Sequence, residues 1–134
     1  MDGKGVPLSL VITGANRHDV SQLEKLLDSV IIERPDIFES PQNLCLDKGY
    51  TGEPALEAVV QRGFIPHIRS RGEEKNTKEQ DPSHKARRWV VEVTHSWMNR
   101  FRKLLVRFEK LTYTYKALLM FSCAFIAFRK AGVI

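Results

Sequence analysis

Cysteine is scarce in this chain of 134 residues, which contains only Cys45 and Cys123. Each lies in an apolar run, and two isolated thiols cannot form the disulfide framework that holds many small secreted domains together. We therefore expect both cysteines to be buried free thiols in a reducing compartment.

Long hydrophobic segments are also missing. The first five residues contain no apolar stretch of the signal-peptide type, and the longest apolar run, residues 117–128, is shorter than the roughly 20 residues that span a bilayer. The hydrophobic content of 43% is nevertheless enough for the core of one domain. The composition predicts a single cytoplasmic domain over residues 1–134.

Acidic residues are scarce in the last third of the chain. Residues 84–130 contain 11 Lys and Arg against 2 Glu, a net charge of +9, whereas residues 1–83 contain 10 against 14, a net charge of −4. A basic region of this kind raises the expectation of a nucleic-acid partner. An evenly solvated helix face would give a similar count.

Short alternating apolar runs and longer runs with a helical period predict strands and helices in alternation, which is an α/β pattern. Pro66 places one strand at a sheet edge, because proline cannot donate a ladder hydrogen bond. Asp19 is expected to cap a helix rather than take part in catalysis. In chain order, the expected elements are a strand at residues 6–13, a helix at 19–31, a strand at 43–46, a helix at 53–62 and a short strand at 64–69.

Two long helices are expected at the carboxyl end. The first runs from residue 88 to about 111 with one continuous apolar seam, so Trp97 and Phe101 in that seam are interpreted as core residues. The second, residues 113–130, is apolar nearly all round and is expected to be buried. Residues 70–85, which precede both helices, contain almost no large apolar side chains and are expected to form a flexible loop.

A carboxylate follows the central predicted strand. Asp47 comes directly after the strand and before a glycine-containing turn, which places it at the edge of a sheet, where loops hold most chemistry. Glu92 lies in the first turns of the basic helix, on the side opposite the apolar seam. A carboxylate pair of this origin can hold Mg²⁺, which prefers oxygen ligands. The alternative is that Glu92 is a solvated side chain paired with Arg88 or Ser96.

These residues resemble two motifs of the DDE transposases of bacterial insertion sequences. Leu46-Asp47-Lys48-Gly49-Tyr50 is similar to the Asp-x-Gly-Tyr segment of that family. Arg88-x-x-x-Glu92, followed by residues 95–102, is similar to the helix that carries its third carboxylate. Residues 13–19 and the tail to residue 134 fit the same family, so the resemblance covers almost the whole chain.

The resemblance implies a fold, a reaction and a set of ligands. The family has a ribonuclease-H-like catalytic domain and cuts and rejoins DNA with two divalent ions, Mg²⁺ or Mn²⁺, held by Asp, Asp and Glu. By that comparison, Asp47 and Glu92 are catalytic metal ligands, and the partners are insertion-sequence ends, target DNA and further copies of the complete protein. The expected DNA contacts are Lys48, Arg87, Arg88, His95, Asn99, Arg100, Arg102, Lys103 and Arg107.

The first aspartate of that family has no counterpart here. In the family it lies on the first strand, beside the strand that corresponds to residues 43–46, and Met1 falls after it. The resemblance therefore implies an incomplete ribonuclease-H-like fold that lacks its first strand and is inactive alone. Three interpretations are open: a carboxyl-terminal transposase part whose front half comes by fusion or association, a decayed remnant that at most binds DNA without chemistry, and an α/β fragment whose basic face is merely solvated.

Overall fold

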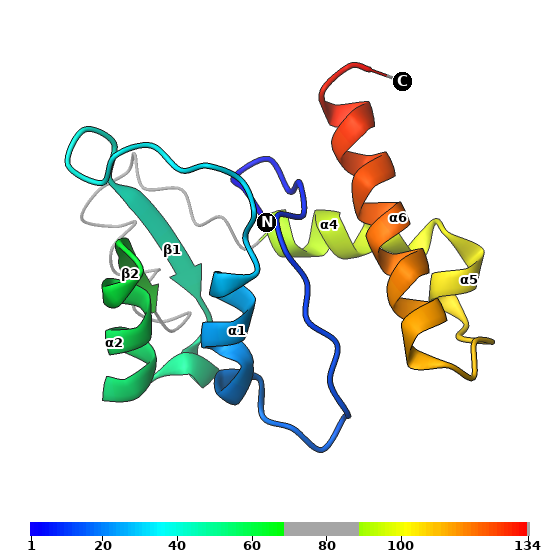
Figure 1. Cartoon of the computed structure of the whole chain (residues 1–134), viewed down its shortest axis with the longest axis horizontal. Helices are drawn as coiled ribbons and strands as arrows, with labels where there is room; N and C mark the ends of the chain where they lie inside the picture. The colour runs from blue at the N-terminus through cyan, green and yellow to red at the C-terminus, as the bar shows by residue number, and fades with distance from the viewer. Residues whose placement is uncertain (69–88, 134) are drawn as a thin grey trace. The chain divides into compact units, whose positions relative to one another are not determined.

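The computed structural model describes residues 1–68 and 89–133 of the chain (Figure 1). The loop predicted at residues 70–85 lies outside this described part. The chain divides into two compact units, here called the helical unit, Met1–Ile12 with Arg87–Ile134, and the sheet unit, Thr13–Ala86. Across the described ranges, no helix is long and apolar enough to cross a membrane.

The sheet unit contains a parallel pair of strands joined by a helix. Strand β1 (Gln42–Leu46) pairs with β2 (Phe64–Ile68), and Leu44 lies opposite Pro66. Helix α2 (Glu53–Gln61) forms the crossover that parallel strands require (Figure 1). Both strands and the helix are confirmed as predicted. Pro66 is at an edge, since the described sheet has two strands.

A small apolar core holds the sheet unit together. Side chains alternate along β1, so Leu44 and Leu46 pack against the core while Cys45 faces outward. The prediction that Cys45 is buried is therefore wrong, although both cysteines are free. The core consists of Leu23, Ala55 and Val59, with Leu27, Leu44, Leu46, Tyr50 and Phe64 packed against it.

The helix predicted at residues 19–31 is shorter in the structure. A 3₁₀ turn, η1 (Asp19–Gln22), precedes α1 (Leu23–Asp28). Asp19 is the first residue of the turn, and the N-cap residue is His18, which makes no side-chain capping bond. The prediction that Asp19 caps this helix is therefore wrong.

Arg62 joins α1 to the end of α2. Its Nε lies 2.7 Å from Asp28 Oδ1 and its Nη2 lies 3.2 Å from Glu24 Oε2, while its Nη1 donates to the Ala58 carbonyl at 3.0 Å. The hydrogen bond from Arg62 lowers the pKa of the Asp28 carboxyl. These ion pairs lie at the surface, where such pairs add little stability, so we assign the cohesion of the unit mainly to its core.

The helical unit consists of α4 (Trp89–Asn99), the short α5 (Arg102–Leu105) and α6 (Thr112–Lys130). The buried hydroxyl of Thr94 donates to the Gly5 carbonyl at 2.6 Å, which ties the amino-terminal segment to α4. Gly5 has a φ of 85°, and a Cβ there would lie 3.2 Å from Thr94 Oγ1. Glycine is thus required at this close approach.

The single helix predicted from residue 88 to about 111 is wrong. The helix is interrupted at Phe101 (φ −83°, ψ 102°) and again at Val106 (φ −126°, ψ 114°), which both adopt extended backbone. The interruption at Phe101 accompanies an edge-to-face contact with Phe125 of α6, whose ring centroid is 5.8 Å away. Val106 is β-branched and suits an extended conformation.

Two further predictions for the helical unit are wrong. Residues 6–12 form no strand in the described structure, because a β-branched run becomes a strand only beside a partner edge. Helix α6 is not buried all round, since α4 and α5 contact only part of its surface. Its buried residues are Ser122 and Ile126, whereas Phe121 is 67% exposed.

Substitution of Val59 tests the position of the core. Val59→Ala is expected to lower the free energy of unfolding by about 2 kcal/mol, because it removes two buried methyl groups and leaves a cavity. Val60 is the matched control, since it lies in the same helix and is 59% exposed. Val60→Ala should change stability by less than about 0.5 kcal/mol in urea denaturation. Equal losses in the two variants would contradict this core.

Candidate metal centre and nucleic-acid interface

Asp47 follows the last residue of β1, at the carboxyl end of the strand. Its Oδ1 accepts a hydrogen bond from the Gly49 amide at 2.8 Å and caps η2 (Lys48–Tyr50). A Cβ at residue 49 would lie 2.9 Å from this oxygen, so glycine permits the close approach. Oδ2 makes no hydrogen bond with a described residue. The exposed carboxylate therefore presents an oriented oxygen at the edge where α/β sheets bind ligands.

Tyr50 is the last residue of η2, and the negative charge near this turn affects its phenol. Burial, followed by the carboxylates of Asp19 and Asp47, raises the pKa of the Tyr50 phenol. The turns η1 and η2 contact each other, which explains why both carboxylates act on one phenol. Asp19, predicted as a helix cap, thus adds negative charge to the surroundings of Tyr50. This charge favours a cation near the end of β1.

Glu92 lies in the first turn of α4 and is exposed. The buried residues of α4 are Val90 and Thr94, which confirms that Glu92 is off the buried side of the helix. Glu92 makes no hydrogen bond or ion pair with a described residue, so the alternative pairing with Ser96 does not occur. The alternative pairing with Arg88 lies outside the described part of the chain.

The two carboxylates suit Mg²⁺ as a donor set. Each has a carboxylate oxygen without a hydrogen bond to a described residue, and Mg²⁺ is commonly held by one or two carboxylates, with water and phosphate oxygens completing the shell. Asp47 belongs to the sheet unit and Glu92 to the helical unit. Among the described residues, no group of three or more His, Cys, Asp or Glu side chains could hold a metal ion.

The predicted DNA contacts are mostly exposed side chains of the helical unit. Arg107 is engaged by its own chain: its Nε donates to the Glu109 carbonyl at 3.1 Å and its guanidinium lies 4.8 Å from the Tyr115 ring centroid. Arg87 and Arg88 lie outside the described residues. The exposed members of the predicted set are Lys48 in the sheet unit and His95, Asn99, Arg100, Arg102, Lys103 and Arg107 in the helical unit.

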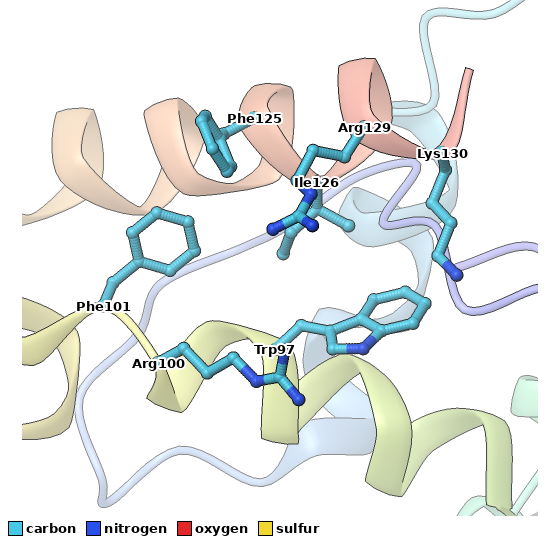
Figure 2. Close-up of a pocket in the computed structure, with 7 residues that line it drawn as sticks. All are labelled: Trp97, Arg100, Phe101, Phe125, Ile126, Arg129 and Lys130. Atoms are coloured by element: carbon cyan, nitrogen blue, oxygen red, sulfur yellow. The ribbon is translucent and has the colours of Figure 1, made fainter. Parts of the chain in front are cut away.

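A pocket of about 500 Å³ lies in the helical unit, between α4 and α6 (Figure 2). The sequence did not predict it, because Trp97 and Phe101 were interpreted as core residues and α6 as buried. Both aromatic residues are half-buried and line the pocket. The sequence signal for this pocket is the pair Arg129 and Lys130, which ends the otherwise apolar α6. The lining consists of Trp97, Arg100 and Phe101 from the α4 side and Phe125, Ile126, Arg129 and Lys130 from α6.

Comparison with known proteins defines the class of this chain. Residues 44–129 match the family described as "Transposase DDE domain", and this range contains both Asp47 and Glu92. The chain belongs to the DDE transposase family. This membership confirms the resemblance seen in the sequence and implies a ribonuclease-H-like fold, in agreement with the mixed α/β structure. That the fold is incomplete stays a prediction.

A particular relative comes from Burkholderia cepacia and is described as a candidate transposase for insertion sequence element IS402. It is 35% identical over 132 residues, which cover 93% of this chain and 58% of the relative. The chain thus spans a little more than half the length of that relative. No solved structure matches the chain.

Proposed function

We propose that the chain acts in DNA transposition, as the part of a transposase that binds element-end DNA and supplies Asp47 and Glu92 as metal ligands. The observation that carries this proposal is the Asp47 carboxylate. It is held at the end of β1 by the Gly49 amide at 2.8 Å, within a range that matches a transposase DDE domain. The relative's description as a transposase supports the same function.

The mechanism assigns separate tasks to the residues of the site. A divalent ion, Mg²⁺ or Mn²⁺, when bound, activates water or a DNA 3′-hydroxyl and stabilises the charge that develops at phosphorus. Asp47 would hold the ion at the end of β1, where the Gly49 amide orients its carboxylate. Glu92 contributes from an exposed helix face, where a DNA phosphate has access. Arg102 and Lys103 hold the DNA backbone through charge, without reading its sequence.

The proposal includes a third carboxylate from outside the described residues. Two-metal catalysis depends on carboxylates that hold both ions a few Å apart, and no described group of three such residues exists. The remaining part of a complete transposase, supplied by fusion or association, would bring this ligand, and the complete protein would act as a homo-oligomer. The chain alone is accordingly proposed to be inactive in cleavage.

A second candidate is a DNA-binding module without chemistry. It is favoured by the same lack of a three-carboxylate group in the described residues, together with the exposed cations of the helical unit. Metal-dependent cleavage by a complete protein that contains this sequence separates the two candidates.

Substitution of the two carboxylates tests the catalytic proposal. In a complete transposase that contains this sequence, Asp47→Asn or Glu92→Gln should reduce cleavage and strand joining by roughly 1,000-fold. This magnitude corresponds to about 4 kcal/mol of lost stabilisation by metal-held charge. DNA binding should persist, as an electrophoretic mobility assay would show. Glu33→Gln, which changes an exposed glutamate in a loop, is the control and should retain activity. Normal transposition by either site variant would refute the assignment.

Substitution of the exposed cations of α5 tests the DNA interface. Arg102→Ala with Lys103→Ala should weaken DNA binding and reduce the slope of log affinity against log salt by up to about 1.8, since each phosphate contact contributes roughly 0.9. Lys4→Ala with Lys25→Ala removes the same charge from exposed positions outside the predicted interface. If both double variants lose the same affinity and salt dependence, net charge rather than a defined interface controls binding.

A further inference from the structure

The pocket between α4 and α6 combines aromatic walls with a cationic rim. Trp97, Phe101 and Phe125 supply the rings, and Arg100, Arg129 and Lys130 supply three positive charges. Figure 2 shows Phe125, Arg129 and Lys130 extending from α6 toward the side of Phe101 and Trp97, while Arg100 runs along α4. Its volume of about 500 Å³ falls within the range of roughly 300–1,000 Å³ typical of small-ligand sites.

The charges of the pocket have no counterpart among the described residues. The described lining contains no carboxylate, and both ion pairs found within residues 1–68 and 89–133 are made by Arg62 in the sheet unit. Lys130 Nζ instead lies 4.2 Å from the centroid of the Trp97 ring. A cation over an aromatic face is a modest attraction when exposed, so an anionic group can draw Lys130 away from it. The pocket is therefore complementary to a ligand that carries negative charge and a flat apolar surface.

We propose that this pocket holds one unpaired nucleotide of the bound DNA, with its base stacked on the Trp97 ring in place of Lys130 and its phosphates on Arg100, Arg129 and Lys130. Within a duplex the faces of a base are covered by stacking, so a paired base cannot use the rings. An unstacked base presents a π-face, and stacking on aromatic side chains is a general mode of single-strand binding. The proposal rests on the proposed function only in taking DNA as the ligand. It adds a preference for single-stranded DNA at a site separate from the carboxylates.

The fluorescence of Trp97 gives a direct test of base stacking in the pocket. The chain has two tryptophans, Trp89 and Trp97, and Trp89 lies outside the pocket lining. In a Trp89→Phe variant, all tryptophan emission comes from Trp97. Titration with a short thymidine oligonucleotide should quench this emission, whereas a blunt-ended duplex should bind without quenching it.

Two double variants that remove the same charge test whether the pocket cations prefer single-stranded DNA. Arg129→Ala with Lys130→Ala should weaken binding of the thymidine oligonucleotide by roughly tenfold, equivalent to about 1.4 kcal/mol. The same variant should weaken duplex binding much less. Lys110→Ala with Lys116→Ala removes two exposed positive charges outside the pocket lining and should lower both affinities alike. Because the oligonucleotide titration needs no change in the pocket itself, the proposal is testable even if the pocket variant fails to fold.

Three results would overturn the pocket proposal. Equal affinity for both DNA forms with unchanged Trp97 emission would reject it and leave the proposed DNA function standing. No binding of either DNA would reject both. A change in Trp97 emission that follows chain concentration rather than oligonucleotide would assign the pocket to a contact between protein chains.

Discussion

Burial of α2 against the parallel strands is the interaction on which the position of Asp47 depends. Val59 is fully buried, and Leu44 and Leu46 of β1 pack against the same core. This packing sets which side of β1 faces the core and holds Leu46, the residue before Asp47, in place. The Gly49 amide then orients the carboxylate that follows. Asp47, which lies on an exposed turn, is thus positioned by the apolar contacts between β1 and α2.

Local sequence determined much of the sheet unit. The apolar run before Asp47, the glycines at the turn and at residue 63, and the proline near the start of α2 are signals that require no long-range partner. The prediction of β1, α2 and β2 from these signals is confirmed. The alternation of side chains along β1 also indicates that Cys45 faces outward. The prediction that Cys45 is buried rests instead on its apolar neighbours Leu44 and Leu46.

The helical unit was predicted less well because its shape depends on tertiary contacts. The seam from residue 90 to 111 has a helical period throughout, and nothing within it requires a break at Phe101. The structure interrupts the helix where the Phe101 ring meets Phe125, two residues that lie far apart in sequence. The same break helps to form the pocket, whose cations Arg129 and Lys130 come from a helix predicted to be buried. The placement of Asp47 and Glu92 in a metal site came from the family resemblance and still awaits its test.

Iron-directed cleavage can test the proposal that Asp47 and Glu92 hold one metal site. Fe²⁺ in place of Mg²⁺ produces hydroxyl radicals in the presence of ascorbate and peroxide, and these cut the nearby backbone. In a complete, DNA-bound transposase that contains this sequence, we expect cuts near residue 47 and near residue 92. Both sets of cuts should disappear in Asp47→Asn and be suppressed by excess Mg²⁺. Cuts at only one of the two positions, or cuts that persist in Asp47→Asn, would contradict a shared site.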